Sequence, residues 1–314
     1  GIDPGPYFGV GKGDIGYIQI TTFNEKTFEK TRDALVELKK NPSVKSIVLD
    51  LRGNGGGLLE SAVQVVGLFV PKGTEVVRYR GRDLLNEKIF KTTHKPVDAD
   101  IPLAVLVNGN SASAAEIVTG ALQDLDRAVV VGERSFGKGL VQSTRQLPYN
   151  GLLKLTIAKY YIPSGRLIQA IDYSHRNPDG SVARIPDSLT TVWHTRAGRE
   201  VRDGGGITPD IKVEYPEGNR LVYNIVRDNW SFDFANRYAA RHESIPSPEE
   251  FEITDTIFNE FKAFIDPSKF EYDRTCELIL EQLEKATKTE GYLNDQVQAQ
   301  LDSLKVTLKH DLNH

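Results

Sequence analysis

The sequence predicts an α/β core with a mixed sheet, built from βαβ units, followed by an all-helical C-terminal region. In residues 15–215, short runs of β-forming apolar residues alternate with segments whose apolar residues recur at helical spacing. From residue 216 onward the strand patterns stop, and no glycine interrupts any candidate helix. The chain has 314 residues, a length that favours about two domains.

The elements of the core follow in order. Residues 1–14 are rich in glycine and proline, so we expect a linker or an extended arm. A strand over 16–23, an amphipathic helix over 25–40 and a buried strand over 44–51 form the first βαβ unit, whose strands should be parallel. The patterns then predict a helix at 58–69, a polar hairpin of 74–80 and 84–91, a strand at 103–107, a helix at 114–125, and strands at 128–131, 140–147, 152–162 and 207–213.

Two regions lie outside the strand and helix patterns of the core. Residues 180–206 are a long polar excursion, which is typical of a lid, a binding loop or a surface insertion. In the C-terminal part, proline and glycine separate four candidate helices, at 219–242, 248–265, 273–287 and 293–312. We expect the aromatic side chains there to form a packing face: Tyr223, Trp230, Phe232, Phe234 and Tyr238.

Composition narrows the classes of function. The chain has 39% hydrophobic and 26% charged residues, which is typical of a globular protein. Its net charge of -4 argues against a nucleic-acid partner. No apolar run is long enough to span a membrane, and no signal peptide is visible. Because the chain lacks methionine and begins at Gly1, we expect a fragment or a processed form. The one cysteine, Cys276, excludes an internal disulfide, and its helical pattern predicts a small buried hydrophobe.

A turn of small residues places a hydroxyl at the start of the 114–125 helix. The free N–H groups and the dipole of a helix N-terminus favour negative charge, so a nucleophile fits there. Ser113 is the candidate. Ser111 is the alternative, because residues 109–113 approach a G-x-S-x-G pattern, although the fifth position is serine.

A serine hydroxyl needs a base, and the next strand and loop offer Lys138 between Gly137 and Gly139. To act near pH 7, this lysine must be neutral, so its pKa must fall from ~10.4 towards roughly 7–8 through desolvation. We therefore expect no carboxylate beside Lys138.

Two motifs carry a family resemblance. Asn108 to Glu116, NGNSASAAE, is followed at residues 130–142 by VVGERSFGKGLVQ, and together they resemble the C-terminal (tail-specific) processing proteases. The likeness extends to LDLRGNGGGLL at residues 49–59 and to GGITPD at residues 205–210. The resemblance implies a crotonase-like protease core and serine endopeptidase activity through a serine-lysine dyad.

Carried over by residue, the resemblance makes Ser113 the nucleophile, Lys138 the general base and Gln142 the group that orients the lysine. It places the oxyanion hole at the N–H of Ala114 and an N–H of the glycine turn, and such donors stabilise charge that develops in the transition state. The two glycines of that turn are Gly56 and Gly57.

Two acidic residues also match the family pattern. Glu116 lies in the first turn of the helix, where it could support the site or simply favour the dipole. Asp124 lies near the helix end, where it could anchor that end or connect to the lysine loop. We treat both as supporting residues.

The resemblance further implies domain organisation and partners. It assigns 1–14 to a linker after a missing PDZ domain, 15–215 to the protease core and 216–314 to a helical domain. The substrates would be protein or peptide tails bound in extended form along a strand edge. Proteases of this family need no cofactor or metal. The resemblance also suggests that the protein is located in the periplasm or cell envelope. The helical domain is a candidate surface for a homo-oligomer.

Two other functions remain open. The first is a catalytically latent peptide-binding module on the same fold. The second is an NTPase, because residues 132–138 follow a strand and match a Walker A loop up to Gly139, which replaces its serine or threonine. The strand pattern after Lys138 argues against it. His175 and His194 lack metal-ligand spacing, so we expect surface histidines.

Overall fold

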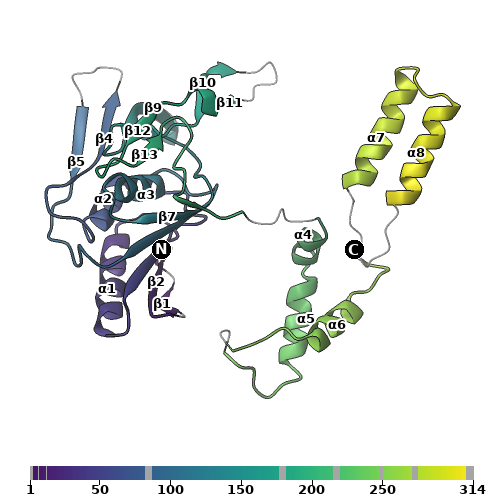
Figure 1. Cartoon of the computed structure of the whole chain (residues 1–314), viewed down its shortest axis with the longest axis horizontal. Helices are drawn as coiled ribbons and strands as arrows, with labels where there is room; N and C mark the ends of the chain where they lie inside the picture. Colours follow the sequence, from purple (N-terminus) through teal and green to yellow (C-terminus); the bar gives the residue numbers. More distant parts are fainter. Residues whose placement is uncertain are drawn as a thin grey trace. The chain divides into compact units, whose positions relative to one another are not determined.

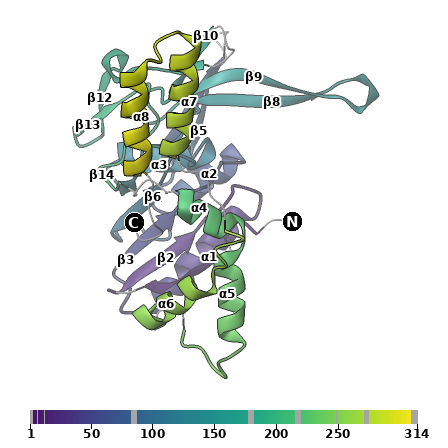
Figure 2. The ribbon, with the colours of Figure 1, turned by 90° about the vertical axis from the view of Figure 1, so that its right-hand side faces the viewer.

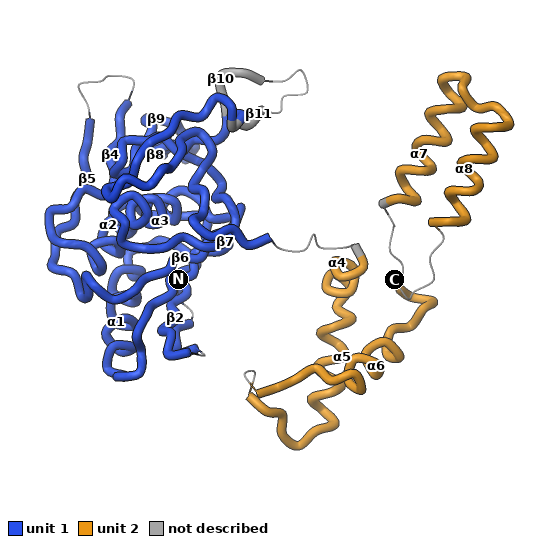
Figure 3. Tube along the Cα trace, in the orientation of Figure 1, with its two compact units in different colours: residues 1–214 blue, residues 215–314 orange. Residues whose placement is uncertain are grey.

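The first part of the chain contains a six-stranded sheet with the order β1-β2-β3-β6-β7-β14. The computed structural model describes residues 3–5, 7–11, 13–81, 87–176, 182–214, 220–247, 250–270 and 275–308. They form two units, residues 1–214 and 215–314 (Figure 3). The strands of the sheet are β1 (Phe8–Gly11), β2 (Ile15–Gln19), β3 (Ser46–Asp50), β6 (Leu103–Val107), β7 (Val129–Gly132) and β14 (Ile211–Lys212).

All neighbours from β2 to β14 pair in parallel, whereas β1 pairs with β2 antiparallel. The mixed sheet is therefore confirmed. The strand β1 corrects the prediction for residues 1–14, because Phe8–Gly11 gains backbone hydrogen bonds from β2 despite its glycines. The closing strand is shorter than predicted, with two residues in place of 207–213.

Three helices cover this sheet: α1 (Thr27–Lys40), α2 (Leu59–Val66) and α3 (Ala114–Asp124). The helix α2 packs against both α1 and α3, as Figure 1 shows. Every residue of α3 is buried, so this helix lies inside the core and its N-terminus is held rigidly. The core residues that surround it come from the parallel strands and from α1 and α2, and include Leu35, Ile47, Leu49, Val65, Val105 and Val107.

A second, four-stranded sheet has the order β5-β4-β9-β8 and is antiparallel. Its strands are β4 (Glu75–Gly81), β5 (Glu87–Lys91), β8 (Leu140–Gln146) and β9 (Leu152–Tyr161). The expected 74–80 and 84–91 hairpin is β4 and β5; residues 82–86 lie outside the described residues. The strands β8 and β9 project from the rest of the unit as a long two-stranded arm (Figure 2).

The polar excursion is more ordered than the sequence indicates. It contains β11 (Val182–Arg184), which pairs with β10 (Ile171–Arg176), and a hairpin of β12 (Val192–His194) and β13 (Glu200–Arg202). His194 is exposed, as expected, and the side chain of His175 lies outside the described residues.

The second unit consists of helices, as predicted, but the first expected helix is divided. Asn229 adopts a left-handed backbone conformation with φ 61°, which ends α4 (Arg220–Arg227) before α5 (Trp230–Ala239) begins. The remaining helices are α6 (Asp255–Phe264), α7 (Thr275–Thr289) and α8 (Asp295–Leu308). None of the described helices is both long and apolar enough to cross a membrane.

Two side-chain predictions for this unit need correction. Trp230, Phe234 and Tyr238 do pack, against aromatic rings of α6 and the segments around it, but Tyr223 and Phe232 are exposed. Both side chains follow the helical spacing. However, no described element covers the side of α4 that carries Tyr223 or the side of α5 that carries Phe232. Cys276 is exposed rather than buried.

Candidate active site

Ser113 lies where β6 has turned into α3, at the N-cap of the helix. Its backbone has φ 59° and ψ -115°, a conformation that L-residues rarely adopt. Such a conformation persists only where the surrounding structure enforces it. The turn thus presents the Ser113 side chain, which is partly exposed, at the positive end of a buried helix.

Ser111, the alternative nucleophile, has a structural role. Its hydroxyl is fully buried, donates to the carbonyl of Leu51 at 2.8 Å and accepts the N–H of Asn108 at 3.0 Å. It thereby ties the end of β6 to the end of β3. A hydroxyl already used in both directions is not available for attack, so the geometry favours Ser113.

The glycine turn lies directly against Ser113. A Cβ on Gly56 would come within 2.7 Å of the Ser113 Cβ, and one on Gly57 would come within 1.9 Å of the Phe23 carbonyl oxygen. Both positions have positive φ, so only glycine fits them without strain. The N–H of Gly56 donates to Asn54 Oδ1 at 2.8 Å. In the part of the chain that the structure describes, no acceptor occupies the N–H groups of Gly57 and Ala114.

The carboxylate of Glu116 joins the nucleophile turn to the lysine loop. Its Oε2 accepts the N–H of Ser113 at 2.9 Å and that of Lys138 at 3.0 Å. Its Oε1 accepts the Ser135 hydroxyl and the N–H of Gly137, both at 2.6 Å. Burial raises the pKa of Glu116, and these donors act in the opposite direction. Glu116 is therefore a bridge across the site, a role that the sequence left open.

Desolvation lowers the pKa of Lys138, and the positive charge of Lys154 lowers it further. The charge of Glu116 opposes the shift. The expectation that no carboxylate lies near Lys138 is therefore wrong. Four hydrogen-bond donors compensate the charge of the Glu116 carboxylate, so it can be buried beneath the lysine loop.

The structure does not bring the dyad into hydrogen-bond contact. Within the described residues, no hydrogen bond joins the Ser113 hydroxyl to the Lys138 side chain. Gln142 lies in β8, where its backbone pairs with Thr156 next to a register shift, and its side chain is exposed. Catalytic hydrogen bonds often tighten only when substrate binds.

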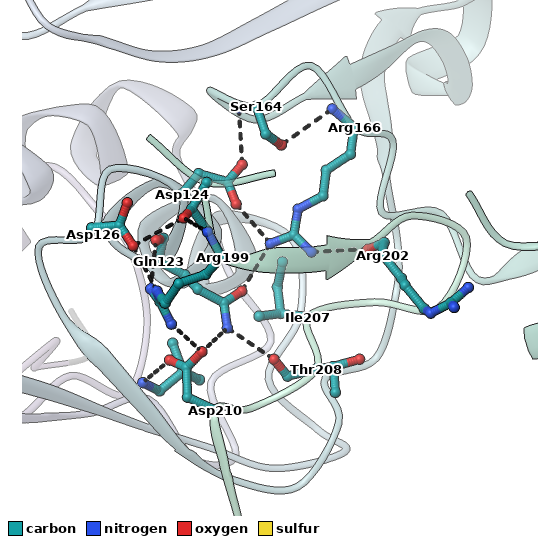
Figure 4. Close-up of polar contacts among 12 residues, drawn as sticks. Gln123, Asp124, Asp126, Ser164, Arg166, Arg199, Arg202, Ile207, Thr208 and Asp210 are labelled. Atoms are coloured by element: carbon teal, nitrogen blue, oxygen red, sulfur yellow. Dashed lines mark hydrogen bonds and ion pairs between the residues drawn. The ribbon is translucent and has the colours of Figure 1, made fainter. Parts of the chain in front are cut away.

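Asp124 anchors the C-terminal end of α3 rather than the lysine loop. It is buried with Arg166, at 2.8 Å between Oδ1 and Nη2, and its Oδ2 accepts the N–H of Ser164. Arg166 also donates to Gln123 Oε1 and to the carbonyl of Arg202 (Figure 4). The turn at residues 163–166 is thus held against the helix end.

The same network reaches the GGITPD segment. Gln123 donates to the carbonyl of Thr208 and to Asp210 Oδ1, and Asp210 Oδ2 accepts the N–H of Val130 (Figure 4). Arg199 forms ion pairs with both Asp126 and Asp210 at 2.6 Å. The downstream motif that resembles the family therefore gives polar support at the end of α3 opposite Ser113. Through Ile207, which donates to Ser135, it also reaches Glu116 at the other end.

Two further residues near the site escaped prediction. Ser135 donates to Glu116 and accepts the N–H of Ile207 at 2.7 Å. The Tyr160 hydroxyl lies 3.5 Å from both the Ser113 carbonyl and Glu116, and burial raises its pKa well above 10. Their partners are distant in sequence, and no local pattern marks either residue.

Two family profiles and several known proteins match this chain. The profile of peptidase family S41 matches residues 14–179, and that of the probable PDZ-protease C-terminal helical domain matches residues 221–314. A carboxy-terminal-processing protease of Bartonella bacilliformis is 47% identical over 208 residues, which are 65% of this chain and 40% of that protein. A probable CtpA-like serine protease of Staphylococcus haemolyticus is 34% identical over 224 residues, 71% of this chain and 43% of that protein.

A solved structure also matches part of the chain. The photosystem II D1 C-terminal processing protease aligns with a TM-score of 0.51 and 29% identity, over 68% of this chain and 49% of that one. In all three comparisons the matched part is less than half of the relative's length.

Proposed function

The chain belongs to peptidase family S41, and on that premise we propose that it is a serine endopeptidase that cleaves extended C-terminal regions of proteins. One observation carries the proposal: the Glu116 carboxylate binds the backbone of Ser113 and of Lys138 together. A single buried group thus sets the spacing of the two residues that the reaction needs. The desolvation that lowers the pKa of Lys138 supports its role as the base.

The proposed reaction is acyl transfer. The neutral Lys138 amine takes the Ser113 hydroxyl proton while Oγ attacks the scissile carbonyl carbon. The oxyanion accepts hydrogen bonds from the N–H groups of Ala114 and the glycine turn, where Gly57 is the better donor because Gly56 already serves Asn54. Lys138 then protonates the leaving amine as the C–N bond breaks. Water, deprotonated by Lys138, hydrolyses the ester and returns the serine.

The remaining roles follow from positions. Gln142, four residues after Lys138, would orient the ammonium once the site closes. No step of this reaction requires a cofactor or metal. We propose further that the protein acts in the periplasm or cell envelope and that its helical domain supports a homo-oligomer. The NTPase alternative loses its support because the chain continues after Lys138 as the strand β8, where a P-loop opens a helix.

The test is hydrolysis of casein by the 314-residue chain and three variants. Ser113→Ala and Lys138→Ala should lose at least ~10³-fold in rate, since each removes a group of one catalytic unit. Ser111→Ala should keep the chemistry and lose stability. Activity that survives Ser113→Ala and disappears with Ser111→Ala would assign the nucleophile to the wrong serine.

A latent peptide-binding module remains the second candidate, favoured by the lack of a Ser113–Lys138 hydrogen bond among the described residues. It predicts that the chain binds unfolded tails with micromolar affinity and releases no new termini. Binding measured together with hydrolysis separates the two functions.

A further inference from the structure

The strands β8 and β9 form a surface next to the proposed site whose charge is of one sign. Residues 138–161 contain four basic residues and no acidic residue. Besides Lys138, these are Arg145, Lys154 and Lys159, all exposed. No described carboxylate forms an ion pair with any of the three. Uncompensated charge of one sign attracts ligands of the opposite sign.

The arm also has a free hydrogen-bonding edge. In the second sheet β8 is the last strand, and among the described strands it pairs only with β9. The strand β4 supports β9 over residues 158–161, so the outer part of the arm is a two-stranded ribbon. Such a ribbon is marginally stable in water, and a third strand along the edge would stabilise it.

The edge leads away from the site. β8 begins at Leu140, two residues after Lys138, and a chain that pairs along β8 passes the general base as it leaves the arm. Arg145 lies five residues farther along the strand, about 17 Å at 3.4 Å per residue. Lys154 lies opposite Thr144 in the register, at the same level of the arm.

From this geometry we propose that the β8–β9 arm selects acidic tails: the substrate adds a strand to the β8 edge and places Asp or Glu side chains against Arg145 and Lys154. The proposal rests on the proposed endopeptidase function and names its substrate class. Arg145 and Lys154 place the acidic positions about five residues from the scissile bond. Acidic side chains next to that bond are disfavoured, because a carboxylate close to Lys138 would keep it protonated.

The experiment uses one globular reporter with three disordered tails of equal length. The tails differ only about five residues on either side of a common apolar cleavage segment, where they carry Asp/Glu, Asn/Gln or Lys/Arg. We measure kcat/KM for the 314-residue chain and, with Ser113→Ala, the Kd of each tail by fluorescence anisotropy. The acidic tail should be cleaved and bound about tenfold better than the basic tail at low salt, and the difference should shrink at 0.5 M salt.

The arm variant combines Arg145→Glu and Lys154→Glu. The ratio of its kcat/KM on the acidic tail to its kcat/KM on the neutral tail should fall below one, whatever its overall rate. The matched control reverses two exposed lysines outside the arm, Lys26→Glu and Lys45→Glu, and should keep the preference.

The outcomes separate the two proposals. The assignment of the arm is overturned if the three tails have equal kcat/KM and Kd values. It is also overturned if the preference for the acidic tail persists in the arm variant. If the acidic tail binds preferentially to the Ser113→Ala chain but no tail is cleaved by the unmodified chain, the arm stands and the endopeptidase function fails.

Discussion

At the scale of single residues, Glu116 has the largest effect on the site. It is fully buried, and each of its two oxygens accepts two hydrogen bonds, from Ser113, Ser135, Gly137 and Lys138. Hydrogen bonds to a charged acceptor are stronger than neutral ones, and a buried donor left without an acceptor is costly. The positions of Ser113 and Lys138 therefore depend on one side chain.

Glu116→Gln should lower activity by at least ~10-fold and stability by about 2 kcal/mol, because an amide offers one acceptor oxygen and turns an NH2 group towards two donors. Urea unfolding and casein hydrolysis measure the two effects. Glu60→Gln is the control, since Glu60 is exposed in the first turn of α2. Equal behaviour of the two variants would show that Glu116 acts only on the helix dipole.

As the proposed general base, Lys138 should determine the pH profile. Its pKa lies below 10.5, and the neutral amine is the reactive form, so kcat/KM should rise with pH through that lowered pKa and then level off. Lys154→Gln removes a repelling charge and should move the rising limb to higher pH. Rates on the neutral tail between pH 5 and 10 measure this. A limb that stays in place would mean that Lys154 does not act on the base.

At the scale of elements, the polar network at the end of α3 fixes the segments around it. Asp124 and Arg166 form an ion pair that is almost fully buried, and Arg166 reaches the carbonyl of Arg202. A buried ion pair contributes little net stability, but breaking it leaves an uncompensated charge. The pair therefore makes the attachment of the turn at 163–166 specific.

Arg166→Met should destabilise the first unit by about 3–5 kcal/mol, because Asp124 stays buried without its partner. The double variant Arg166→Met/Asp124→Leu should regain most of that loss. Arg199→Met removes an ion-paired but exposed arginine and should cost less than about 1 kcal/mol. Urea unfolding tests the series, and a double variant as unstable as Arg166→Met would contradict the argument.

At the scale of the whole molecule, the free energy of unfolding depends on pH. The carboxylates responsible have contacts in the folded state that favour their charged form. Burial would raise the pKa of Asp98, but Lys39 and the N–H groups of Ile101 and Asp100 lower it to about 2. A depressed folded pKa contributes stability above the unfolded value of 3.8, and this is lost as the pH falls towards 2. The contact links α1 to the segment before β6.

Asp98→Asn should lower stability by about 1 kcal/mol at pH 7, less than the full pKa shift implies because water screens the pair. The difference from the unmodified chain should vanish near pH 2. Asp100→Asn, an exposed neighbour in the same segment, should have little effect at either pH. Thermal unfolding between pH 2 and 7 measures these differences in stability. If the difference between Asp98→Asn and the unmodified chain does not change with pH, the lost stability comes from packing.

Local patterns were sufficient for the elements around Ser113, but they missed β1 and the hairpin of β12 and β13. The apolar runs at 103–107 and 128–131 and the helical spacing after Ala114 depend only on neighbours in sequence, and they correspond to β6, β7 and α3. The turn of small residues was likewise enough to place Ser113 at a helix N-terminus. By contrast, the exposure of Cys276 and Phe232 depends on what covers a helix face, and spacing alone cannot supply that.

The sequence by itself determined the main strands and helices of the core, the family and the two residues expected to react. Only the tertiary structure decided how they are held: Glu116 reaches Lys138 across 22 positions, and Asp124 reaches Arg166 across 42. It also decided that Ser111 is bound to Leu51, 60 positions away. Periodicity records which face of an element is apolar, whereas a buried polar group takes its partner from whichever segment the folded chain brings beside it.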